Sequence, residues 1–136
     1  MNNIFTKCGK SAIVVLSQNN QADGNLFVSM PKEFLGFFTS DSKQWLDLPA
    51  WREAHGWDKD GALGDMQVDL DPDRLELTMS SSQPFPKVSV FNHIDHDLLG
   101  NVTGETRAPG PLADPGAKRI WQLDSRSVAP AENQVR

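Results

Sequence analysis

The chain has 136 residues, of which 38% are apolar, and this is enough for one domain with a modest core. Its 18 acidic and 13 basic residues give a net charge of -5 with no run of Lys or Arg, which argues against nucleic acid or an anionic membrane surface as the main partner. The single cysteine, Cys8, excludes an intrachain disulfide and a cysteine-based zinc site. The N-terminal residues lack the features of a signal peptide, and no apolar run approaches the ~20 residues of a membrane span.

Three short strands are predicted near the N-terminus, in residues 3–6, 12–16 and 25–30. The middle run, AIVVL, is apolar without alternation and rich in β-branched residues, which is typical of a strand that is covered on both faces. The polar corners between the runs are rich in Asn, Asp and Gly, which tolerate left-handed conformations. This spacing of strands suits either a β-sandwich or successive sides of a β-solenoid coil.

Asparagines directly before two of these runs favour the solenoid. Asn2 and Asn3 precede Ile-Phe, and Asn25 precedes Leu-Phe-Val. In a solenoid, corner residues stack coil upon coil and their side-chain amides can form ladders.

Residues 31–60 are predicted to be a helical excursion from the strands, because this stretch is aromatic and charged without strand-like alternation. Asp47 or Leu48 suits the helix N-cap, and Pro49 is tolerated in the first turn, where its missing N–H costs nothing. Gly56 is placed where a left-handed C-terminal stop would end the helix.

The second half begins with two further strands, residues 66–70 and 75–77, around the turn Asp71-Pro72-Asp73. Another short strand is predicted over residues 87–91. Residues 92–136 are rich in Gly and Pro and are predicted to wrap as a coat over the preceding strands, with a last strand at residues 120–123 and a frayed end.

Several segments in this order resemble the C-terminal part of right-handed parallel β-helix proteins of the pectate-lyase-like family, many of which are polysaccharide lyases or glycoside hydrolases. These segments are NNIF, NLFV, the helix ending in PAWREAHGWD, the turn DPD followed by RLEL, and a tail with Asp97-Leu-Leu-Gly100, Arg107-Ala-Pro-Gly110 and Asp114-Pro-Gly116-Ala117. The resemblance implies a single all-β domain over residues 1–136. Its expected parts are the last coils of a parallel β-helix in residues 2–30 and 66–91, one short flanking helix, and an irregular C-terminal coat.

The resemblance also implies a function. Enzymes of this family carry their catalytic residues on central coils, upstream of the matching segments, so the chain is expected to be a non-catalytic, C-terminal portion of a polysaccharide-associated protein. Polysaccharide is then an expected partner, as are a second copy of the chain or missing N-terminal coils, because a cut solenoid exposes open strand edges. The family is often secreted or periplasmic.

A second hypothesis stays open beside it. The same strands could form antiparallel hairpins in a small β-sandwich that binds a ligand or another protein without catalysis. Asp23-Gly24 is the only tight hairpin dipeptide between apolar runs, which makes this alternative less favoured.

Tryptophans are the candidate binding residues, because aromatic faces suit the C–H surfaces of sugar rings. Trp51, in the middle of the predicted helix, is expected in the core, and Trp57, just past the glycine stop, is expected to be the most exposed. The predicted substrate-binding residues are Trp57, Trp45 and Asp58. No catalytic residue is predicted, because nothing in the sequence shows which carboxylates converge across a sugar.

Two ionisable clusters invite a metal hypothesis. His93 and His96, with Asp95 and Asp97, could suit zinc or iron, but their spacing is not that of a helical motif, and Asp97 is favoured as a turn-former. The acidic run Asp65, Asp69, Asp71 and Asp73 fails the EF-hand template, which would need Gly at Arg74 and Glu at Ser80. No metal site or cofactor is predicted, although a structural calcium ion is left open.

Overall fold

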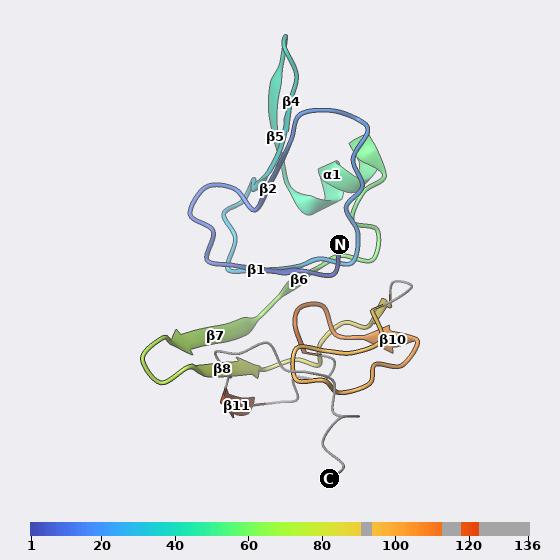
Figure 1. The fold of residues 1–136 in the computed structure, drawn as a ribbon. Helices are drawn as coiled ribbons and strands as arrows, with labels where there is room; N and C mark the ends of the chain where they lie inside the picture. Colours follow the sequence, from blue (N-terminus) through green and yellow to red (C-terminus); the bar gives the residue numbers. More distant parts are fainter. Residues whose placement is uncertain (91–93, 113–117, 123–136) are drawn as a thin grey trace. The chain divides into compact units, whose positions relative to one another are not determined.

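The computed structural model describes residues 1–90, 94–112 and 118–122, and it divides the chain into two compact units (Figure 1). Unit 1 is Met1–Gly64, and unit 2 is Asp65–Arg136. The predicted C-terminal fraying lies outside the described residues.

Unit 1 contains two small three-stranded sheets and one helix. One sheet has the order β1-β3-β6 and is parallel throughout, and the other has the order β2-β4-β5, with β2 parallel and β5 antiparallel to β4. The elements are β1 (Ile4–Thr6), β2 (Ile13–Val15), β3 (Leu26–Val28), β4 (Leu35–Phe38), β5 (Lys43–Leu46), α1 (Leu48–His55) and β6 (Ala62–Gly64).

Helix α1 begins and ends as its sequence predicts. The side chain of Asp47 at the N-cap accepts a hydrogen bond from the backbone N–H of Ala50 at 2.9 Å, and Pro49 lies in the first turn. At the other end Gly56 has φ +69°, and its N–H donates to the carbonyl of Arg52 at 2.9 Å. Both ends of α1 were predictable from the sequence, because each is set by one neighbouring residue, Asp47 at the start and Gly56 at the end.

The core of unit 1 joins both sheets to the helix. Trp51 of α1 is fully buried, which confirms its predicted place in the core. Around it lie buried side chains from β2, β3, β4 and the residue before β4, and from the start of α1 and the segment after it, namely Val15, Phe27, Phe34, Leu35, Phe37, Leu48 and Trp57. Burying large aromatic side chains contributes most to the stability of so small a unit.

Unit 2 contains an antiparallel sheet of β7 (Met66–Asp71), β8 (Glu76–Ser81) and β11 (Lys118–Gln122), with β8 in the centre. Met66, Leu77 and Met79 are buried while Gln67 and Asp69 are exposed, as expected of strands with one covered face. A second pair joins β9 (Val88–Ser89) to β10 (Thr106–Arg107) in antiparallel orientation.

The predicted right-handed parallel β-helix is wrong. The described strands form four small separate sheets, and four of their pairings are antiparallel: β4 with β5, β7 with β8, β8 with β11, and β9 with β10. The physical reason lies in the turns. Asp71 accepts backbone N–H groups from Asp73 and Arg74, so the chain reverses into a hairpin where a solenoid coil would continue forward.

The parallel signal is nevertheless present locally. Asn3 and Asn25 lie side by side before β1 and β3, and their side-chain amides are hydrogen-bonded, Asn3 Nδ2 to Asn25 Oδ1 at 3.1 Å. The paired asparagines therefore correctly indicate that β1 and β3 are parallel. The described strands do not continue this pairing into a stack of coils.

The prediction for residues 31–60 missed the β4–β5 hairpin. Its strands show no alternation in sequence because both faces carry aromatic side chains. Leu35 and Phe37 point into the core, while Phe38 packs edge-on against Trp45 on the other face, with ring centroids 5.1 Å apart. Gly36 leaves room for the indole of Trp45, which would lie only 3.1 Å from a Cβ at that position.

Candidate functional site

A buried carboxylate organises the region where α1 meets the parallel sheet. Asp58 has no exposed surface and a left-handed backbone, with φ +51°. Its Oδ1 accepts hydrogen bonds from Asn25, at 2.6 Å from Nδ2 and 3.3 Å from the backbone N–H. The N–H of Asp58 donates to the carbonyl of Ala22 at 2.6 Å. Asp58 therefore ties the segment after α1 to the start of β3.

Asn3, Asn25 and Asp58 form a directional series that we call the amide ladder. The backbone N–H and Nδ2 of Asn3 donate to Asn25 Oδ1 at 2.9 and 3.1 Å, just as the same two groups of Asn25 donate to Asp58 Oδ1. Each asparagine thus gives two hydrogen bonds to one oxygen of the next side chain. The ladder fixes the register of β1 against β3.

Arg52 links the helix to the same place from the other side. Its Nε donates to the carbonyl of Asp58 at 2.8 Å, and Nη2 donates to the carbonyl of Gly61. The N–H of Gly61 donates in turn to the Asp58 carbonyl at 3.1 Å. The short loop from Asp58 to Gly61 is held by these bonds, so β6 follows the helix in a fixed position.

The ionisation of Asp58 is disfavoured by its surroundings. Burial raises the pKa of the Asp58 carboxyl, and the two hydrogen bonds from Asn25 oppose this only in part, while the charge of Asp23 raises it further. The Trp51 indole also favours the charged form, although neither its Nε1 nor Asp58 Oδ2 makes a hydrogen bond of good geometry in the part of the chain that the structure describes. The folded protein therefore favours the neutral form of Asp58, and the hydrogen bonds of this residue give it a structural role.

His55 lies inside a cluster of aromatic rings at the end of α1. Its ring centroid is 4.5 Å from Phe37, 4.9 Å from Trp51 and 4.8 Å from Trp57, the last in a stacked arrangement. Burial lowers the pKa of His55 because it disfavours the charged imidazolium. A neutral His55 therefore serves as a packing group between aromatic side chains.

The three predicted substrate-binding residues are not gathered into one surface. Trp57 was expected to be the most exposed tryptophan but is only 8% exposed, because its rings pack against Trp51 and His55. Asp58 is completely buried, and Trp45 lies half-buried on β5 beside Phe38. These placements do not test sugar binding at Trp57, Trp45 and Asp58, which stays a prediction.

The acidic and histidine clusters serve local structure. Asp71 caps its turn with two 3.0 Å hydrogen bonds from backbone N–H groups. Asp97 accepts backbone N–H groups from Leu99 and Asn101, both at 2.9 Å, which confirms it as a turn-former. His96 pairs with Asp95 at 2.8 Å, and His93 lies outside the described residues. Within the described ranges no group of three or more potential metal ligands is brought together.

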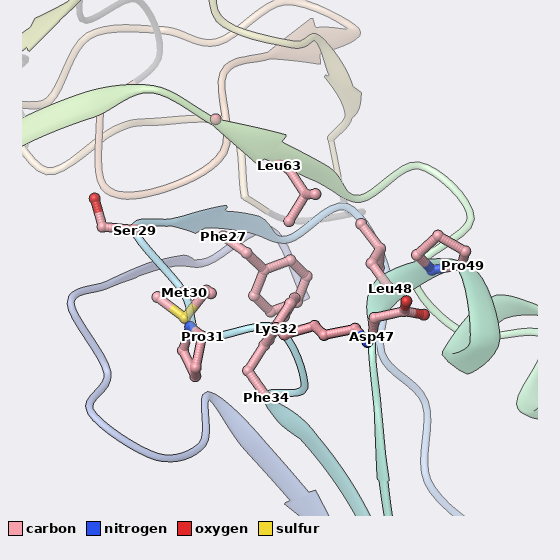
Figure 2. A pocket seen from close by; sticks show the side chains of 11 residues that line it. Phe27, Ser29, Met30, Pro31, Lys32, Phe34, Asp47, Leu48, Pro49 and Leu63 are labelled. Carbon is pink, nitrogen blue, oxygen red and sulfur yellow. The ribbon is translucent and has the colours of Figure 1, made fainter.

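A pocket of about 470 Å³ opens on unit 1 between β3, β6 and the start of α1 (Figure 2). Its floor consists of the buried side chains of Phe27, Phe34 and Leu48. Leu63 of β6 lies at the rim with 63% of its surface exposed, beside Phe27, its partner in the strand register. The remaining lining residues are Ser29, Met30, Pro31, Lys32, Asp47, Pro49 and Gly64.

Few polar groups face this pocket. Lys32 is exposed, and Figure 2 shows its side chain running across the pocket toward Asp47. The Asp47 carboxylate is already occupied as the cap of α1. Ser29 has φ +52°, a conformation that side chains other than Gly and Asn seldom adopt, and strain of this kind is often found at binding sites. The pocket is therefore mainly apolar, with the ammonium-bearing side chain of Lys32 across it (Figure 2).

No protein-family model, curated protein or solved structure matches this chain. The resemblance to pectate-lyase-like proteins is therefore wrong, because the sheets contradict the fold and no relative supports the family or its link to carbohydrate. In the described part of the chain, no helix has the length and apolar character needed to cross a bilayer.

Sequence reasoning missed the pocket residues. The four residues that matter most, Phe27, Phe34, Leu48 and Leu63, come from four separate segments. Leu63 lies in the sequence Gly-Ala-Leu-Gly, which is too short for periodicity to reveal a strand. The only available signal was an isolated apolar residue among glycines, and this does not specify a site.

We predict that Gly61→Ala destabilises unit 1. An added Cβ would lie 3.0 Å from Asp58 Cβ and 3.1 Å from the carbonyl oxygens of Asn25 and Asp58, and backbone atoms held by hydrogen bonds cannot move aside. The free energy of unfolding should fall by about 1–3 kcal/mol, measured by urea denaturation with tryptophan fluorescence. Gly9→Ala is the matched control, because nothing lies within 4 Å of its added Cβ. Equal stability of the two variants would contradict the packing described for Gly61.

A second prediction concerns pH. Because the folded pKa of Asp58 is raised, the folded state binds a proton more tightly than the unfolded state, so protonation of Asp58 stabilises unit 1. Asp58→Asn keeps an oxygen for Asn25 and suits a left-handed backbone, but it cannot ionise. The free energy of unfolding of wild type, relative to that of this variant, should therefore rise as the pH falls from 7 through the raised pKa of Asp58 in the folded protein. The rise ends below the ordinary pKa of the carboxyl in the unfolded chain.

Parallel urea titrations of both proteins at each pH measure this difference. The contribution of His55 is common to both and cancels in the comparison. If the difference in unfolding free energy between wild type and Asp58→Asn stays constant, or if wild type loses stability relative to the variant on acidification, the pKa of Asp58 is not raised in the folded state.

Proposed function

We propose that this chain is a binding module without catalytic activity, and that unit 1 holds a small, mainly apolar ligand in the pocket beside Leu63. The observation that carries the proposal is the pocket floor. Three buried apolar side chains from separate segments of unit 1, Phe27, Phe34 and Leu48, form one concave surface that stays open to solvent.

The size and lining of the pocket agree with this assignment. Its volume of about 470 Å³ falls within the ~300–1,000 Å³ of small-molecule sites. Such sites are mostly apolar with a few polar groups that orient the ligand, and Lys32 is the lining residue that suits this role (Figure 2). Because Lys32 and Asp47, two residues of opposite charge, both line the pocket, a neutral ligand with one hydrogen-bonding group fits better than a charged one.

The absence of catalysis is proposed from the roles of the nearby carboxylates. Asp47 is engaged by the backbone of α1, and Asp58 is completely buried with its Oδ1 engaged by Asn25. A general acid or base must reach its substrate within hydrogen-bonding distance. Neither carboxylate is free to do so in this arrangement.

The proposal predicts that N-phenyl-1-naphthylamine, a neutral apolar dye, binds unit 1 at one saturable site with a blue-shifted emission. Leu63→Asp should weaken this binding about tenfold, because a charged side chain replaces an apolar contact at the rim. The dissociation constant is measured by fluorescence titration of the full chain.

Leu16→Asp is the matched control. Leu16 belongs to unit 1 and is 71% exposed, but it does not line the pocket, so the same chemical change there should leave dye binding unaltered. Failure of the dye to saturate, or equal weakening by both variants, would overturn the assignment of the pocket.

A further inference from the structure

Strand β1 forms one edge of the parallel sheet of unit 1. Leu26 N–H donates to the Asn3 carbonyl at 2.8 Å, and Lys7 N–H donates to the Val28 carbonyl at 3.1 Å. In a parallel ladder the residues that bond to one neighbour alternate along the strand, so the backbone groups of Ile4 and Thr6 point away from β3. Among the described strands, only β3 pairs with β1, so this outer row has no strand beside it.

The amide ladder has a direction, and it ends at this edge. Asp58 Oδ1 receives two hydrogen bonds from Asn25, and Asn25 Oδ1 receives two from Asn3. Asn3 is exposed, and within the described residues its Oδ1 accepts no hydrogen bond. The next member of the series must therefore offer both a backbone N–H and a side-chain N–H, and asparagine is the residue that offers both in this geometry.

The side chains of β1 repeat those of β3 in register. Ile4 lies beside Leu26, Phe5 beside Phe27, and Thr6 beside Val28. The rings of Phe5 and Phe27 are stacked, with centroids 5.5 Å apart and planes inclined by 12°. Phe5 is only partly buried, so it can take a further aromatic ring from above in the same way that Phe27 takes Phe5.

We propose that β1 binds an extended segment of a partner polypeptide, added parallel to it, with the pattern asparagine, aliphatic residue, aromatic residue, β-branched residue. The asparagine of the partner would align with Asn3 and continue the amide ladder. Main-chain hydrogen bonds to Ile4 and Thr6 would supply affinity, and the asparagine and the aromatic residue would supply specificity. This inference does not depend on ligand binding in the pocket, since it concerns a different surface.

The probe is a fluorescein-labelled peptide that copies residues 23–30 of this chain, DGNLFVSM, with both ends blocked. We expect saturable binding to the full-length chain, measured by fluorescence anisotropy. The same peptide with its asparagine replaced by alanine should bind about fivefold more weakly, as expected for loss of one hydrogen bond. Equal binding of the two peptides would overturn the proposed recognition of asparagine.

Ile4→Pro tests the edge itself. Its outward N–H is removed while the bonds from β1 to β3 are kept, and edge positions of this kind are where proline is tolerated in sheets. We expect peptide binding to be lost, with an unchanged urea-unfolding transition of tryptophan fluorescence as evidence that unit 1, whose core contains Trp51 and Trp57, is folded. Asn3→Ala, which keeps the backbone N–H bond to Asn25, should weaken binding of the asparagine peptide about fivefold but leave the alanine peptide unaffected.

The other outcomes would each overturn the proposal. Unchanged peptide affinity in both Ile4→Pro and Asn3→Ala would place the peptide elsewhere. Concentration-dependent association of the protein that Ile4→Pro abolishes, without any binding of the peptide, would assign this edge to a second copy of the chain.

Discussion

The hydrogen-bonded pair of Asn25 and Asp58 is the constraint on which unit 1 depends. Both side chains are almost completely buried, at 1% and 0% exposure. A buried polar group that loses its partner costs about 1–3 kcal/mol, so the fold cannot place one of these residues without the other. Since Asn25 directly precedes β3 and Asp58 follows α1, their pairing fixes the helix and the parallel sheet against each other.

The sequence predicted local features well where a single residue type determines the backbone. Asp47, Pro49 and Gly56 specify the ends of α1 through capping and left-handed geometry, and these are properties of a few neighbouring residues. The two strands β7 and β8 and the turn residues between them were also predicted, although their antiparallel pairing was not. The asparagines before β1 and β3 indicated parallel pairing correctly for those two strands.

The long-range arrangement was not predictable from these signals. Parallel pairing of two strands does not specify how many more follow, and the turn at Asp71 reverses the chain by hydrogen bonds that the sequence pattern does not display. The β4–β5 hairpin was hidden because the side chains of Phe38 and Trp45 make its outer face as aromatic as its inner face. The burial of Trp57 depends on its contacts with Trp51 and His55, residues that stand nearby in sequence but meet only once the helix has formed.

Phe27 connects the two surfaces to which binding is assigned. Its ring forms part of the pocket floor, and it also supports Phe5 at the edge of the sheet. The residues that follow β1 and β3 show a further regularity, because Lys7 and Ser29 come directly after aligned strand ends and both have left-handed backbones, with φ +51° and +52°. For residues with a Cβ this conformation costs roughly 1–2 kcal/mol, which glycine avoids. The two strand exits are therefore matched positions for thermostability engineering, where Lys7→Gly and Ser29→Gly would relieve the same backbone strain.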